Sequence, residues 1–215
     1  MMRLGEKLLG IALLLALTGP LYAAGEGKTS KPFDQSGVIV DVHTFFKAAA
    51  GQQQPATTQA GPADRALVTA EGVYAFLETP ENQKWLAGTE SGSVVQVKGK
   101  LLEKGALLHI DALKATSKIS LDLDLAGLRN APGKKIALKG MNKCQCGLDV
   151  ADLPHSCALG HLHHLEAEDG ITYNYLQIAE GKEIFLGQGS HFKSVEVQGR
   201  LLPGHFLLVE KVEVD

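Results

Sequence analysis

The stretch "VQVKGKLLEKGALLHIDAL", residues 95–113, has a close counterpart one hundred residues later in "VEVQGRLLPGHFLLVEKVEV", residues 195–214. The two align without a gap, and most of their valines, their leucine pairs and one glycine, Gly99 or Gly199, coincide. Each copy alternates apolar and polar residues, turns, and becomes apolar again, a pattern that predicts a β-hairpin. A repeat with this spacing has the size of a domain, so we expect two similar β domains.

The residues before each hairpin also follow one order in both halves. An opening strand is predicted at "GVIVDVHTF" (37–45) and at "KKIALKGMNKC" (134–144). A long loop, two strands joined by a tight turn, and a short polar piece then lead to the hairpin. This order resembles the oligonucleotide/oligosaccharide-binding (OB) fold, a five-stranded Greek-key barrel. The resemblance implies an all-β protein with short helices, built as two tandem OB-like five-stranded barrels.

The predicted domains are residues 36–114 and 134–215, joined by a linker at 115–133. Within the linker, apolar residues alternate from Ile119 to Leu125, which indicates an edge strand. The alternative to two barrels is a single irregular sandwich in which only the hairpins are alike. Trp85, the only tryptophan, aligns with apolar residues of the second half and is expected in the core.

The N-terminus reads as an export signal. A positive start at Arg3 precedes the apolar run "LLGIALLLAL", and Gly19-Pro20 and small residues follow. This pattern predicts a signal peptide over residues 1–24, cleaved near Ala23 or Ala24. A membrane anchor is the alternative, but the run is shorter than the roughly 20 residues that span a bilayer. The mature protein is therefore predicted to be periplasmic or secreted and not embedded in a membrane.

Composition narrows the possible partners. The chain has 215 residues, a formal net charge of −3, and basic residues scattered along its length. A nucleic-acid binder would be expected to gather them into a basic patch, so nucleic acid is not a predicted partner. The expected partners are a metal ion or another exported protein.

The two halves differ most in the loop after their first strand. In the first half this loop, residues 47–64, is rich in Ala, Gln, Thr, Gly and Pro and is predicted to be flexible. In the second half the same position holds "NKCQCGLDVADLPHSCALGHLHHLEAEDG" (142–170), with all three cysteines and four of the eight histidines. In OB folds this loop helps to form the binding surface. The resemblance therefore implies a specialised binding loop in the second half.

Three thiolates and an imidazole suit a closed tetrahedral zinc site, and thiolates also suit copper(I). The sequence therefore predicts a zinc or copper site. Its candidate ligands are Cys144, Cys146, Cys157, His161 and His163. If the second strand begins near residue 160, then His161 and His163 face one way and His164 the other.

Two alternatives to a metal stay open. Exported cysteines meet an oxidising compartment, so Cys146 and Cys157 could close a structural disulfide in a metal-free interaction protein. Catalysis by Cys157 with a nearby histidine would also need an oxyanion site and a substrate pocket, which the sequence does not reveal. A non-catalytic binding module is favoured over an enzyme.

The front of the second half is also similar to small exported bacterial proteins of uncharacterised families. The similarity lies in closely spaced cysteines, a later Cys157-Ala158-Leu159 and the strand that begins "DGITY" at Asp169. This resemblance implies export and a cysteine-centred site and carries no established activity.

Overall fold

A computed structural model describes residues 30–46, 49, 64–116, 121–144, 163–176 and 192–215. The predicted signal peptide and most of the loop predicted to be flexible lie outside these residues. No helix among them is long and apolar enough to cross a membrane.

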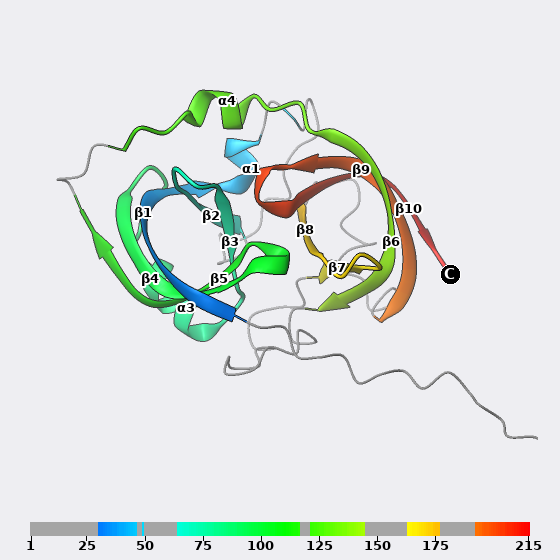
Figure 1. Ribbon diagram of the computed structural model, residues 1–215, viewed down its shortest axis with the longest axis horizontal. Helices are drawn as coiled ribbons and strands as arrows, with labels where there is room; N and C mark the ends of the chain where they lie inside the picture. Colours follow the sequence, from blue (N-terminus) through cyan, green and yellow to red (C-terminus); the bar gives the residue numbers. More distant parts are fainter. Residues whose placement is uncertain (1–29, 47–48, 50–63, 117–120, 145–162, 177–191) are drawn as a thin grey trace, which may run out of the picture.

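The chain forms two closed five-stranded barrels, side by side in Figure 1. The first contains β1 (Ser30–Asp41), β2 (Arg65–Val68), β3 (Val73–Phe76), β4 (Val94–Leu102) and β5 (Leu107–Ala115). The second contains β6 (Lys134–Cys144), β7 (His163–Ala167), β8 (Thr172–Leu176), β9 (Lys193–Leu202) and β10 (Phe206–Val214). Both have the neighbour order first–second–third–fifth–fourth, closed by pairing of the first and fourth strands. The predicted pair of OB-like barrels is confirmed. The first strand begins at Ser30, before the predicted 37–45, and residues 42–45 form the short helix α1 (Val42–Phe45) instead.

The barrel walls curve at matched glycines. Gly99 in β4 and Gly199 in β9 each lie where a neighbouring strand passes very close. A Cβ at either position would overlap the backbone carbonyl oxygen of His109 or of Leu208. Both glycines lie beside an irregularity in the pairing with β5 or β10. Glycines and bulges are the usual means of bending strands into a small barrel.

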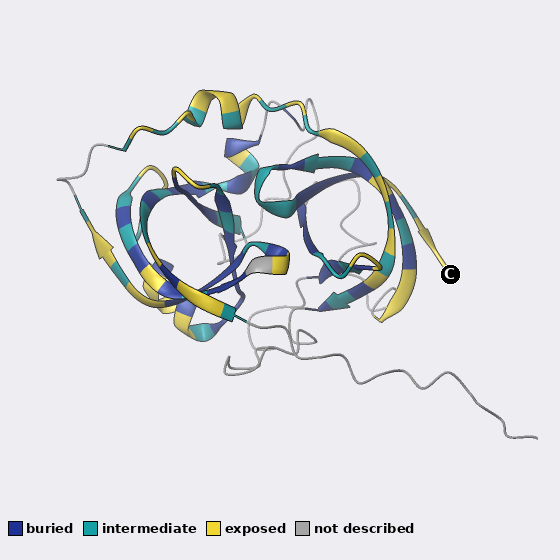
Figure 2. Cartoon of the chain, in the orientation of Figure 1, coloured by how far each residue is buried: buried dark blue, intermediate teal, exposed yellow. Residues whose placement is uncertain are grey.

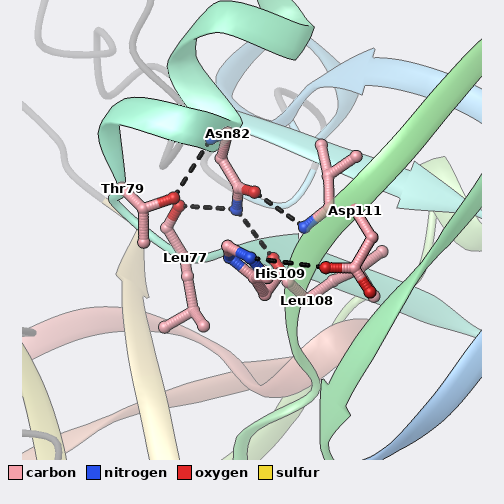
Figure 3. Close-up of polar contacts among 7 residues, drawn as sticks. Leu77, Thr79, Asn82, Leu108, His109 and Asp111 are labelled. Carbon is pink, nitrogen blue, oxygen red and sulfur yellow. Dashed lines mark hydrogen bonds and ion pairs between the residues drawn. The ribbon is translucent and has the colours of Figure 1, made fainter. Parts of the chain in front are cut away.

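The third and fifth strands of the first barrel separate at Asn82 of α3 (Pro80–Leu86). A regular parallel ladder would next join the Ile110 amide to the Leu77 carbonyl. The Asn82 carboxamide lies between them instead, with Nδ2 donating to Leu77 O at 2.8 Å and Oδ1 accepting from Ile110 N at 2.7 Å (Figure 3). Nδ2 also lies 2.9 Å from Leu108 O. This fully buried side chain therefore completes the hydrogen bonding of the strand edges.

Each barrel inserts its hairpin turn against the third strand of the other. The first turn, Glu103–Gly105, accepts a hydrogen bond from Asn174 Nδ2 of β8 at Gly105 O, 3.3 Å away. The second turn, Pro203–His205, packs so close to β3 that a Cβ on Gly204 would lie 2.8 Å from Val73 O. Each barrel therefore makes the same kind of contact with the other, so an approximate two-fold relation holds between them.

A shared hydrophobic cluster fills the space between the barrels. Val68 and Val73 of the first barrel join Leu202, Phe206 and Leu208 of the second in this cluster. Each barrel also has its own interior cluster. Figure 2 shows buried residues along both barrels and where they meet. The strands on this side are therefore buried on both faces.

The described part of the linker contains a short helix and no edge strand. Residues 121–124 form no strand, and α4 (Leu125–Arg129) follows them, above the barrels in Figure 1. Asp124 caps this helix by accepting from Gly127 N at 2.7 Å. Leu123, Leu125 and Leu128 pack on the cluster between the barrels. The alternating leucines thus cover that cluster, and for residues 121–125 the edge-strand prediction was wrong.

Candidate functional site

Two of the predicted ligands lie side by side at the base of the cysteine and histidine loop. Cys144 is the last residue of β6, His163 is the first of β7, and the antiparallel register places them directly opposite. Side chains at opposite positions share one face of a sheet, with Cβ atoms about 4.5–5.5 Å apart. Both residues are buried, with 1% and 5% of their surface exposed. A thiol and an imidazole therefore meet where the loop leaves the barrel.

This pair faces the interior of the second barrel. Two residues earlier in β6, Asn142 lies opposite Leu165, a fully buried member of the barrel's own core. Because side chains alternate along a strand, Cys144 and His163 share that inward face. His164 faces the opposite way, level with Asn174 at the barrel interface, as the alternation predicted. We call the end of the barrel marked by Cys144 and His163 its loop end.

The inward-facing row continues onto β8. The register of β7 and β8 pairs Leu165 with Tyr173, and continuing it brings His163 level with Tyr175. Tyr175 is buried in the same interior core, and burial raises the pKa of its phenol. The loop end is therefore lined by an amide, a thiol, an imidazole and a phenol.

The matching row of the first barrel has different chemistry. There Asp41 of β1 lies opposite Arg65 of β2, and the strand register brings Arg65 level with Phe76. Asp41 accepts a hydrogen bond from Thr44 N at 2.7 Å and so caps α1 (Val42–Phe45). The register therefore aligns Cys144 with an aspartate and His163 with an arginine.

Arg65 secures the end of helix α3. Its Nη1 donates to the backbone oxygens of Leu86 and Thr89, both at 2.6 Å. Leu86, the last residue of the helix, packs into the interior core of the first barrel. The neighbouring Trp85 is 39% exposed, so its predicted place in the core was wrong.

The remaining predicted ligands, Cys146, Cys157 and His161, lie outside the described residues, as does the alternative Cys146–Cys157 disulfide. Among the residues that the structure describes, no three Cys, His, Asp or Glu side chains are grouped to hold a metal. The structure thus brings Cys144 and His163 together and leaves the complete ligand set as a prediction.

Sequence reasoning missed Asn142 and Tyr175 as lining residues. The signal that could have found them is the repeat itself, extended from the hairpins to the first and third strands. It would have aligned Asn142 with Ile39 and Tyr175 with Phe76, and so shown two polar groups at otherwise apolar interior positions. No protein-family model, curated protein or solved structure matches this chain.

The loop of the first barrel is joined at its two ends. His43 Nε2 lies 3.0 Å from Asp64 Oδ1, and both side chains are mostly buried. Ala49, within the segment predicted to be flexible, is also buried. These contacts hold the chain on both sides of the loop predicted to be flexible. Within that loop, residues 47–48 and 50–63 lie outside the described residues.

Two histidines outside the loop should make stability depend on pH. Burial lowers the pKa of His109, and Asp111 partly opposes that shift. Burial also lowers the pKa of His205, and a hydrogen bond to the Thr172 backbone partly opposes that shift. In the unfolded chain both should titrate near pH 6.5. Their contribution to stability is present above that pH and is lost as pH falls through the folded-state pKa values.

We therefore expect the urea midpoint to fall between pH 7.5 and 5.5, and the double substitution His109→Gln with His205→Asn to flatten that dependence. Asparagine suits position 205 because its φ is +57°. An unchanged pH dependence in this variant would contradict the assignment.

Proposed function

We propose that this protein is an exported, non-catalytic binding module that holds one zinc or copper(I) ion in the loop of its second barrel. The ligands would be Cys144, Cys146 and Cys157, with His161 or His163 as the fourth. Such a set gives the closed tetrahedral coordination of a zinc site, and its thiolates also suit copper(I).

The observation that carries the proposal is the pairing of Cys144 with His163 at the loop base. The loop leaves the barrel at one ligand-type residue and returns at another directly opposite, so two of the proposed ligands already lie together. The first barrel provides an internal comparison, because its aligned pair, Asp41 and Arg65, instead caps helices.

The site of action is proposed to be the periplasm or the extracellular space, on the basis of the N-terminal signal pattern. In an oxidising compartment a metal competes with disulfide formation for the same thiolates. The experiment must therefore use reduced protein and separate the two outcomes.

Purified mature protein, reduced and exposed to zinc or copper(I), is expected to retain about one ion per chain after desalting. Replacing Cys144 or Cys157 with serine should weaken binding by about 100-fold or more, because serine is a much poorer ligand for these metals. Affinity should also fall as pH drops, since protons compete for thiolate and imidazole. Elemental analysis and competition with a chromogenic chelator measure both effects.

The matched controls are His43→Gln and His109→Gln in the first barrel, which should bind as the parent does. If the reduced protein takes up no metal, or if Cys157→Ser binds as tightly as the parent, the metal proposal fails. A Cys146–Cys157 disulfide in the unreduced protein, found by peptide mapping, would then favour the metal-free interaction module.

A further inference from the structure

We propose that each barrel uses the face of its second and third strands to bind the other barrel, so that the two fold and unfold as one unit. In OB-type barrels this face and the loop after the fourth strand bind oligonucleotides or oligosaccharides. In this chain the other barrel occupies that face on both sides of the interface. The inference does not depend on the proposed metal site.

The face of the first barrel is apolar and covered. Four residues share it through the register of β2 with β3, and at most 3% of each is exposed: Ala66, Val68, Val73 and Ala75. They belong to the hydrophobic cluster that also contains Leu202, Phe206 and Leu208 of the second barrel. The apolar surface that an external ligand would meet is therefore already buried.

The matching face of the second barrel carries polar residues and is covered in the same way. Thr172 and Asn174 of β8 lie on it, 1% and 7% exposed, and strand register aligns Thr172 with Val73. Asn174 Nδ2 donates to Gly105 O of the first turn. A Cβ on Gly105 would lie 3.0 Å from the Thr172 Cβ. In the second turn, a Cβ on Gly204 would lie at the same distance from the Val73 Cβ, so the two turns make equivalent contacts with aligned residues.

Burial links the stability of the two halves. Phe46 of the first barrel and Phe206 of the second lie 5.6 Å apart between ring centroids, and neither residue is more than 1% exposed. Among the described residues, the shared cluster has more buried members than the interior of either barrel. Unfolding of one barrel would expose the face of the other to water, which costs free energy in proportion to the apolar area exposed. We therefore expect the two barrels to unfold together.

The first test damages the second barrel and reads the first. Leu207 is fully buried in the interior of the second barrel, outside the shared cluster, and Trp85 of α3 is the only tryptophan. In the full chain, Leu207→Ala should lower the urea midpoint of Trp85 fluorescence by about 1 M or more. If that midpoint equals the parent's while hydrogen exchange in β9 and β10 is faster, the inference is overturned.

The matched control is Val214→Ala, because Val214 at the end of β10 is 45% exposed. It should leave the Trp85 midpoint unchanged. Where Leu207→Ala prevents the second barrel from folding, Trp85 fluorescence in water decides. An unfolded signal then supports the coupling, and a native signal contradicts it.

The second test breaks the interface. Val73→Asp places a charge on the buried face of β3, and Ala112→Asp places the same charge at an exposed position of β5. Val73→Asp should speed amide exchange in β9 and β10 by about 10-fold or more, because the second barrel loses its cover. Ala112→Asp should leave that exchange unchanged. Equal exchange in the two variants would show that this face does not couple the barrels and would overturn the inference.

Discussion

Replacing Gly99 with alanine is expected to unfold the first barrel, with a loss of at least about 4 kcal/mol in the free energy of unfolding. The added methyl would overlap the His109 carbonyl oxygen, a backbone atom held in the β4–β5 pairing. Removing this overlap would require the two strands to separate, because neither backbone can rotate away within a closed barrel. Gly199→Ala should do the same to the second barrel through the carbonyl of Leu208.

Urea denaturation followed by tryptophan fluorescence measures the effect in the first barrel, because Trp85 of α3 is the only tryptophan. The control is Gly92→Ala, whose φ of +92° is strained for alanine but whose Cβ would meet no atom within 4 Å. It should cost about 1 kcal/mol, the left-handed strain alone. Equal losses in Gly99→Ala and Gly92→Ala would contradict the steric account.

Replacing Asn82 with alanine is expected to lower the free energy of unfolding by about 3–4 kcal/mol. The change removes three buried hydrogen bonds and leaves the Ile110 amide and the Leu77 carbonyl without the group that joins them. Leu108 O keeps its bond from Leu77 N at 3.0 Å and Leu77 O keeps its bond from Thr79 N at 2.9 Å, so the buried Ile110 amide is the group left without its partner. Trp85 fluorescence in urea reports this loss as well.

Asn130→Ala is the matched control, because Asn130 donates one exposed hydrogen bond, to Ala126 O. It should change stability by no more than about 0.5 kcal/mol. A loss below about 1 kcal/mol for Asn82→Ala would show that the strand edges find other partners, such as water.

Part of the candidate site could be predicted from the sequence. The export signal, the metal and the ligand set remain predictions, with only Cys144 and His163 placed by the structure. The opposite directions of His163 and His164 followed from strand alternation, because that period is local. The lining by Asn142 and Tyr175 was not evident, since it depends on the alignment of three strands distant in sequence.

The sequence by itself determined the two repeated hairpins and the strand order from which two barrels were predicted. The gapless repeat, its turns and the paired Gly99 and Gly199 specify the hairpins, and local alternation with turn chemistry is enough to do so. Only the tertiary structure decided that Leu86 rather than Trp85 closes the first barrel, that Asn82 bridges separating strands, and that Cys144 meets His163. These outcomes depend on barrel closure and on strand register between distant segments, which local periodicity does not encode.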